Sequence, residues 1–453
     1  MSTEVAEKLA EFATRVRIKD IPSETVEFTK GLCLKTVAGM LRGSGMPAGL
    51  KASRSSRQRG HAPEAGVIGS GFRTSLWNAV LNNAFFAHAS ELEDDRFGGM
   101  GTCWDITVLP VTFTFAEKLK LSGQELLEMT AIGLEVHART CLFYPQGYMG
   151  MTVIPGAMGP AAAAARALKL GIPETVAALG LSMSSAPIAY ASFGTDSHYF
   201  ESAMQSLQGL IAAELAQQGA TGNPDIVSYM VGLLGKDKVE PAKFVQNLGH
   251  EWMLNAIWIK KYPCCFYLHR YLEALFELMA TEKISYEQVE RVSVHISQVE
   301  RCCDRPDPQT FDDLQFSFQH SHGVAMIDKD VNFSHISEEA RLNPKYREAR
   351  AKVNVVFHPE WVSAYAMGTP AQLEVSLKDG RQFFRENNHV IGSPAHPLTM
   401  EQFKALFIKF TRDVLPDAEL RWTVDALARL EELDQCEVAK LMHILVHKKE
   451  PGR

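Results

Sequence analysis

The spacing of apolar residues changes twice along the chain, and this change constrains the fold most strongly. From residue 1 to about 258, apolar residues recur at helical spacing, in stretches broken by glycine or proline. Residues 289–297, 351–359 and 371–384 instead alternate, are rich in β-branched residues and include a hairpin signal, Asp379–Gly380. Helical spacing returns after residue 398. We therefore predict a mainly α protein: a helical body (residues 1–265 and 399–453) with an inserted, smaller α/β domain (residues 266–398).

The composition of the chain argues against several classes of protein. The 453 residues carry a net charge of -7, which offers no basic surface for nucleic acid. No apolar run reaches the length of a membrane span, and the N-terminus begins directly in an amphipathic helix pattern with no signal segment. The eight cysteines are scattered and include two adjacent pairs, Cys264–Cys265 and Cys302–Cys303. This pattern indicates reduced thiols, so we expect a cytoplasmic protein that binds neither nucleic acid nor membrane.

An acidic cluster stands out in the stretch HASELEDDRFGGMGTCWD, residues 88–105. It contains Glu91, Glu93, Asp94 and Asp95. On a helix, Glu91 and Asp95 share a face with His88 one turn earlier. A solvated helix end is one interpretation, but the apolar run before the cluster and the glycines after it favour a pocket. Nothing here resembles a calcium-binding loop, and no ligand-spaced set of Cys, His, Asp and Glu predicts a metal site.

Other candidate residues are more isolated. Lys260 and Lys261 end an aromatic run just before Pro263, where a lysine can hold a substrate carboxylate or simply be exposed. Histidines occur at His198, His269, His320 and His322, and a cysteine occurs at Cys103. Single histidines and cysteines are more often structural than catalytic. His320 and His322 face the same way only on a strand, and they lack ligand partners at suitable spacing.

Taken in order, several segments resemble the MmgE/PrpD family, which includes 2-methylcitrate dehydratase, cis-aconitate decarboxylase and iminodisuccinate epimerase. HASELEDD resembles the family's H-A-x-D-F-D-D, and GLEVHAR resembles its G-x-E-V-x-x-R. GAMGPAAAAARALKLG, IKKYPCCFYLH, FSFQHSHGVAMID and LEVSLKDGR follow in the family's order and cover nearly the whole chain. The resemblance implies a helical domain with an α/β lid, in a homodimer. It also implies an active site between the domains that uses neither metal nor organic cofactor.

At the positions expected in the active site, this sequence matches the family only in part. Positions that match the family keep their polar residues at Asp94, Thr152 and Lys260. Other positions depart from the family: Glu91 replaces its first motif aspartate, Asp95 a threonine, Cys103 a histidine, His198 a lysine and His320 a tyrosine. A second family histidine falls near Gly150, where this chain has Tyr148 and Met151 instead. The loss of cationic groups argues against a tricarboxylate substrate.

These observations suggest a cofactor-independent lyase or isomerase. It would abstract a proton next to a carbonyl or carboxylate, leading to dehydration, decarboxylation or isomerisation of an organic acid larger or less charged than 2-methylcitrate. We expect Lys260 to stabilise negative charge or anchor a carboxylate and to contribute little to folding. His198 and His320 are the expected acid and base, Glu91 or Asp95 an orienting group or second base, and Cys103 an acid or nucleophile. The expected substrate contacts are Asp94, Thr152, Tyr148, Met151 and His269. The alternatives are a catalytically inactive binding or regulatory scaffold and a metal-dependent hydrolase.

Overall fold

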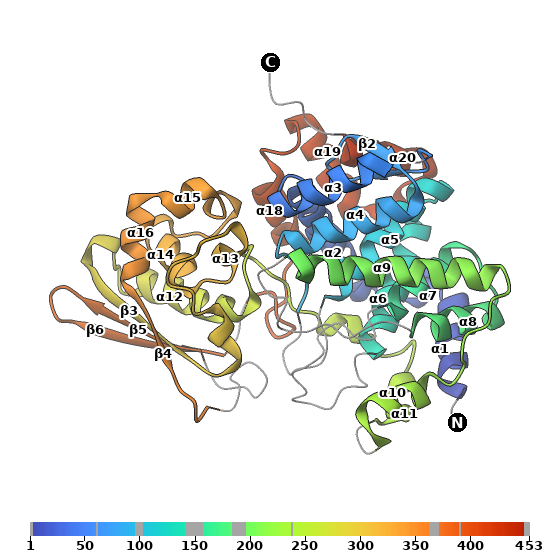
Figure 1. Ribbon diagram of the computed structural model, residues 1–453, viewed down its shortest axis with the longest axis horizontal. Helices are drawn as coiled ribbons and strands as arrows, with labels where there is room; N and C mark the ends of the chain where they lie inside the picture. Colours follow the sequence, from blue (N-terminus) through green and yellow to red (C-terminus); the bar gives the residue numbers. More distant parts are fainter. Residues whose placement is uncertain are drawn as a thin grey trace.

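The computed structural model describes residues 3–59, 62–95, 103–140, 157–183, 196–236, 239–361, 371–388 and 391–447. They form a large helical body and a smaller α/β lid that lie side by side (Figure 1). One hydrophobic core takes its residues from Val5 to Ile259 and from Leu398 to Leu445. A second core takes its residues from Trp258 to Leu377. The predicted mainly α fold with a small α/β part is confirmed.

The helical body is a bundle in which small residues allow close packing. Its helices are α1 (Glu4–Arg15), α2 (Ser23–Gly43), α3 (Pro47–Arg59), α4 (Leu76–Ala89), α5 (Trp104–Leu119), α6 (Gly123–Thr140), α7 (Met158–Ala167), α8 (Ile172–Ser182), α9 (Asp196–Gln217), α10 (Ile226–Leu234), α11 (Pro241–Val245), α18 (Met400–Thr411), α19 (Asp417–Ala428) and α20 (Gln435–Val446). The alanine-rich α7 packs against α6, α5 and α9. A Cβ on Gly159 of α7 would lie 2.6 Å from the Cβ of His137 on α6, so only glycine permits this approach.

The expectation that residues 1–258 are entirely helical is wrong at one place. Strands β1 (Ala65–Val67) and β2 (Phe72–Thr74) form a two-stranded antiparallel sheet. Gly69 and Gly71, between the strands, both have φ of +67°, a conformation that favours glycine and lets the chain turn back. The C-terminal helical stretch is also interrupted, because α19 ends at Ala428 and α20 starts only after the helix-capping Asp434.

The lid contains a four-stranded sheet in the order β4-β3-β5-β6. Its elements are α12 (His269–Thr281), β3 (Val289–Ile296), α13 (Phe311–Gln315), α14 (Phe318–Asp328), α15 (Glu338–Leu342), α16 (Pro344–Ala351), β4 (Val353–Phe357), β5 (Ala371–Leu377) and β6 (Gln382–Asn387). β3 and β4 are parallel because helices connect them, whereas the Asp379–Gly380 turn makes β5 and β6 antiparallel. The strands and the hairpin turn therefore lie where alternation predicted them.

The acidic stretch is fixed to the segment that enters the lid. Asp95 and Trp258 exchange two backbone hydrogen bonds, of 3.0 and 2.7 Å. The next residue, Ile259, donates its N–H to the carbonyl of Gly392, at 2.9 Å, where the chain returns from the lid. Lys260 follows at once and is thereby placed opposite the acidic residues. Among the described residues, no helix is long and apolar enough to cross a membrane.

Candidate active site

The acidic residues lie in a buried loop and not on a helix. Helix α4 ends at Ala89, and Glu91 has φ of +53°, so the expected common helix face of His88, Glu91 and Asp95 does not form. All four acidic residues are at most 8% exposed. A solvated helix end is therefore excluded. Burying carboxylates this close together requires positive charge or protons nearby.

Lys260 supplies that charge for two of the acids. Its Nζ lies 3.0 Å from Oε2 of Glu91 and also donates a hydrogen bond to Oε1 of Glu93. Burial disfavours its charged form, but Glu91 and Glu93 outweigh burial and hold the pKa of Lys260 well above its usual value. Burial and the neighbouring Glu93 raise the pKa of Glu91 to about 8, despite Lys260. Lys260 is only 1% exposed and pairs with two buried carboxylates, so the structure leads us to expect a larger contribution to folding than the sequence suggested.

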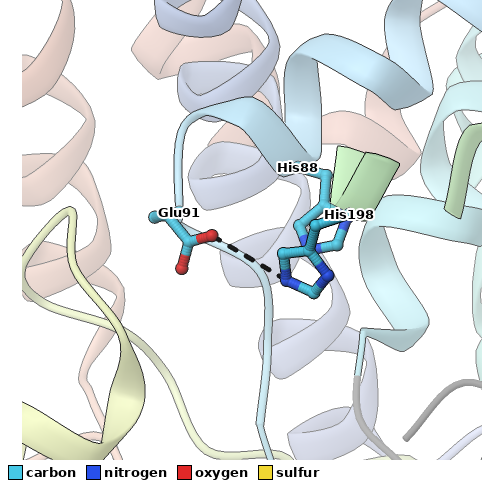
Figure 2. A group of neighbouring side chains, drawn as sticks. All are labelled: His88, Glu91 and His198. Carbon is cyan, nitrogen blue, oxygen red and sulfur yellow. Dashed lines mark ion pairs between the residues drawn. The ribbon is translucent and has the colours of Figure 1, made fainter. Parts of the chain in front are cut away.

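Two histidines complete this side of the cluster. His88 comes from α4 and His198 from α9, and their ring centroids are 4.0 Å apart. Nε2 of His198 lies 4.0 Å from Oε1 of Glu91, as Figure 2 shows. Burial lowers the pKa of His88 to about 3 and that of His198 well below its usual value. Both imidazoles are therefore uncharged near neutral pH and can accept a proton or bind an ion.

A second group of charged residues, Asp94, Asp105 and Lys35, holds the acidic loop in place. The backbone N–H of Asp105 donates to Oδ1 of Asp94 at 2.7 Å, and the N–H of Asp94 donates to Oδ1 of Asp105 at 3.2 Å. The buried Lys35 forms an ion pair with Asp105. Burial and Asp105 hold the pKa of Asp94 well above its usual value, so the pair shares a single negative charge. These contacts give Asp94 a positioning role in the loop.

Cys103 adjoins the same loop at the start of α5. Its backbone N–H donates to the carbonyl of Asp94 at 3.2 Å, and the residue is 4% exposed. It has φ of +67°, which is uncommon for a residue with a side chain. The ligand-capable atoms of Cys103, His88 and Glu93 lie within 4.8 Å of one another. The loop thus brings a thiol to the carboxylates and the imidazole.

Models of two family domains match this chain. The MmgE/PrpD N-terminal domain matches residues 7–235, and the MmgE/PrpD C-terminal domain matches residues 262–430. The chain belongs to the MmgE/PrpD family. It is 24% identical over 388 residues to cis-aconitate decarboxylase from Mus musculus, covering 81% of this chain and 78% of the relative. The Homo sapiens enzyme of that name is 24% identical over 349 residues (73% and 72%), and the one from Aspergillus terreus 24% over 363 residues (74% and 74%).

The remaining residues predicted for the site lie in different surroundings. Asp95 is held by its backbone bridge to Trp258. His269 begins α12, where its Nε2 lies 3.3 Å from the carbonyl oxygen of Cys264 and its ring stacks on Phe266. His320 uses both ring nitrogens within the lid, and no contact of the described residues joins it to His198. Thr152, Tyr148 and Met151 lie outside the described residues.

The spacing of residues in the sequence did not predict which side chains that could bind a metal ion lie close together in this member of the MmgE/PrpD family. Two sets within the described residues have ligand atoms within 4.8 Å of one another: His88, Glu91 and His198, and His88, Glu93 and Cys103. The first set joins residues more than a hundred positions apart, so no local motif announces it. The sequence indicated His88 only as a residue near the acidic cluster, and it did not distinguish Glu93 from the other three acidic residues.

Proposed function

We propose that this protein is a lyase or isomerase that acts next to a carboxylate of a small organic acid and needs no cofactor. The observation that carries the proposal is the buried Lys260–Glu91 ion pair beside His198. A fixed ammonium next to a neutral imidazole suits the formation of a carbanion or enolate, because the cation stabilises the charge as the base removes a proton. The similarity to three decarboxylases supports a lyase in particular.

Each residue has a defined part in this proposal. His198 accepts or returns the proton, and Glu91 orients it. Lys260 places its positive charge where negative charge develops on the substrate. In a decarboxylation, the bond from carbon to the leaving carboxylate breaks and its electron pair stays on the carbon. A proton then ends there, supplied by Glu91, whose raised pKa keeps it protonated near neutral pH, and passed on by His198. Dehydration and isomerisation begin with a proton transfer in the opposite direction, from a carbon of the substrate to His198.

The charge of the cluster favours a substrate with few carboxylates. The side chains of Glu91 and Glu93 already engage the single ammonium of Lys260, so the cluster has no further cation among the described residues for the carboxylates of a substrate. A tricarboxylate entering this buried cluster would find too little positive charge to balance its own, and burial makes unbalanced charge costly. We therefore propose a monocarboxylic or dicarboxylic acid, less charged than 2-methylcitrate or cis-aconitate.

A solvent-exchange experiment tests the proposal. The purified protein is incubated in D2O with cis-aconitate, 2-methylcitrate and a panel of monocarboxylic and dicarboxylic acids, and NMR and mass spectrometry follow each acid. We expect at least one of the less charged acids to take up deuterium next to its carboxylate, with loss of CO2 or water if the enzyme is a lyase. Rapid turnover of cis-aconitate or 2-methylcitrate would contradict the proposed substrate class.

A binding or regulatory scaffold is the alternative, and one observation favours it. The ammonium of Lys260 already has two carboxylate partners and is 1% exposed, as expected for a purely structural cation. The same experiment separates the two functions. A scaffold would shift the NMR signals of an acid that it binds but would exchange no hydrogen and release no product.

A further inference from the structure

Three oxygen or nitrogen atoms around Lys260 are buried and lack a hydrogen-bond partner among the described residues. They are Nε2 of His88, Oε1 of Glu91 and Oε2 of Glu93. His88 is fully buried, Glu91 is 1% exposed and Glu93 is 7% exposed. A buried polar atom without a hydrogen-bond partner destabilises the fold. Three such atoms at one place therefore point to a ligand that completes the cluster.

The protonation of His88 is set by its neighbour. Its Nδ1 lies 2.7 Å from the hydroxyl of Ser202, and this hydroxyl donates its own hydrogen to the carbonyl of Tyr199, at 3.1 Å. In this arrangement the hydroxyl oxygen is free to accept the hydrogen of Nδ1. That tautomer places the lone pair of His88 on Nε2, the nitrogen without a hydrogen-bond partner. A second hydrogen bond of this kind commonly orients a histidine that binds a metal ion.

The other two ligands converge on the same point. Lys260 holds Oε2 of Glu91 at 3.0 Å, which leaves Oε1 directed toward His198. In Figure 2 the dashed line joins this carboxylate to His198, and ligand atoms of His88, Glu91 and His198 all lie within 4.8 Å of one another. Tetrahedral ligands about 2.0–2.1 Å from zinc are about 3.3 Å apart. The 4.0 Å between Oε1 of Glu91 and Nε2 of His198 therefore has to shorten only slightly.

We propose that His88, Glu91 and His198 bind a divalent transition-metal ion of the zinc type. Two imidazoles and one carboxylate suit zinc or cobalt, whereas magnesium and calcium prefer oxygen ligands. The overlapping set has one imidazole fewer and contains the thiol of Cys103, which has to lose its proton to bind an ion. The ion occupies the groups that move the proton in the proposed function, so it inhibits that reaction. Binding itself does not depend on the proposed function.

Cobalt binding tests this site without measuring turnover. The full-length protein is treated with chelator, dialysed and titrated with Co2+, and visible absorption reports tetrahedral coordination. His443 on α20 and His447, which directly follows that helix, are both exposed and form a competing surface pair, so a His443→Gln/His447→Gln variant serves as the background. We expect one tetrahedral ion per chain in this background, with Zn2+ displacing Co2+.

Variants in the same background locate the ion. His88→Gln should weaken binding by more than about 100-fold, and Ser202→Ala by roughly 10–100-fold, since Ser202 only orients a ligand. His322→Gln, which changes a buried histidine in the lid, should leave the affinity unchanged. Circular dichroism and thermal unfolding confirm that each variant folds. Zn2+ should also raise the midpoint of thermal unfolding of the unmutated protein but not of His88→Gln.

Three results would overturn the proposal. The first is an absence of tetrahedral Co2+ absorption in the folded protein. The second is an affinity that His88→Gln leaves unchanged. The third is a sulfur-to-cobalt charge-transfer band, which would assign the ion to Cys103, His88 and Glu93 instead. Failure of the solvent-exchange experiment would affect none of these readouts, so the two proposals fail separately.

Discussion

Two of the ion clusters that are buried among the described residues differ in how completely their polar atoms are bonded. In the first, Glu135 and Arg139 lie one turn apart on α6 and are at most 1% exposed. Arg139 donates to Oε1 of Glu135 at 2.6 Å, and its terminal nitrogens donate to the carbonyls of Phe244, Gln246 and Glu251. Oε2 of Glu135 accepts the backbone N–H of Leu254, at 3.0 Å. This pair fixes the segment from 244 to 254 against α6.

The second cluster, around Lys260, has the same ingredients but leaves atoms without partners. His88, Glu91 and Glu93 each keep one buried atom that makes no hydrogen bond to a described residue. A cluster that serves only the fold has no reason to retain such atoms, because each one reduces stability. The comparison teaches that burial and charge alone do not mark a functional site. This cluster is set apart because several unbonded atoms meet at one place, whereas single unbonded atoms also occur elsewhere, as at Oδ1 of Asn82.

Breaking the fully bonded pair should have the largest effect on stability. Arg139→Met leaves Glu135 as a buried carboxylate without its cation and leaves three carbonyls without donors. We expect the free energy of unfolding to fall by about 3–5 kcal/mol. Urea unfolding followed by circular dichroism measures the change. A loss below about 1 kcal/mol would mean that the pair is not needed to hold the segment from 244 to 254.

Removing the cation of the second cluster should instead affect chemistry most. Lys260→Met should lower turnover of the substrate found by solvent exchange by roughly 100- to 1000-fold, as expected for the loss of one preorganised charge. The neighbouring Lys261 pairs with Glu273 outside the cluster, so Lys261→Met is the matched control and should keep its activity. Equal activities of the two variants would remove Lys260 from the reaction.

Loss of Lys260 also leaves two buried carboxylates, so stability has to be separated from activity. Lys260→Met/Glu93→Gln removes one charge of each sign. We expect this double variant to unfold at a urea concentration closer to that of the unmutated protein than Lys260→Met does, with no recovery of turnover. If the double variant recovered both its stability to urea and its turnover, Lys260→Met would have been inactive only because it was unstable.

Local pattern was sufficient to predict much of the fold. Alternation located β3, β5 and the Asp379–Gly380 turn, because a half-buried strand alternates its side chains. The β1–β2 sheet was missed because its strands have only three residues each, too short to establish a period. The expected helix through Glu91 failed for another reason. The tertiary contacts of the loop with Trp258 and Asp105 outweigh the helical preference of its residues.

The site was predicted less completely than the fold. Lys260 and Glu91 were candidates both from their surroundings in the sequence and from the family resemblance, and the structure shows that they touch. That His88 lies against His198 depends on the packing of α4 against α9, which no local spacing encodes. The same holds for Lys35, whose contact with Asp105 joins two helices. Sequence names the reactive residue types, but the packing of distant helices decides which of them meet.

Acid should destabilise the lid through His320, a histidine with both nitrogens bonded. Its Nε2 lies 2.7 Å from the carbonyl oxygen of His335, and its Nδ1 faces the guanidinium of Arg350, at 3.2 Å. Burial lowers the pKa of His320 to about 4 from its usual 6.5. The unfolded chain therefore binds the proton first. The stabilisation is complete above about pH 6.5 and is lost as the pH falls toward 4, by up to about 3 kcal/mol.

Urea unfolding at several pH values between 4 and 7 measures this effect. His320→Gln, which cannot titrate, should show a flatter dependence of the free energy of unfolding on pH over this range. An unchanged slope would mean that other buried histidines, such as His137, dominate acid unfolding; the pKa of His137 is lowered by burial to about 3.

The smallest effect is expected where an ion pair is exposed. Nζ of Lys8 lies 2.7 Å from Oε1 of Glu4 on α1, a shorter separation than the 3.0 Å between Lys260 and Glu91. Both side chains are about half exposed (48% and 52%), so water and salt screen their attraction, and each remains solvated when its partner is lost. Lys8→Gln keeps a good helix former at this position and should leave the midpoint of urea unfolding unchanged within experimental error. If it destabilises the protein as much as Arg139→Met does, distance and not burial governs these pairs, and the contrast between the two buried clusters loses its physical basis.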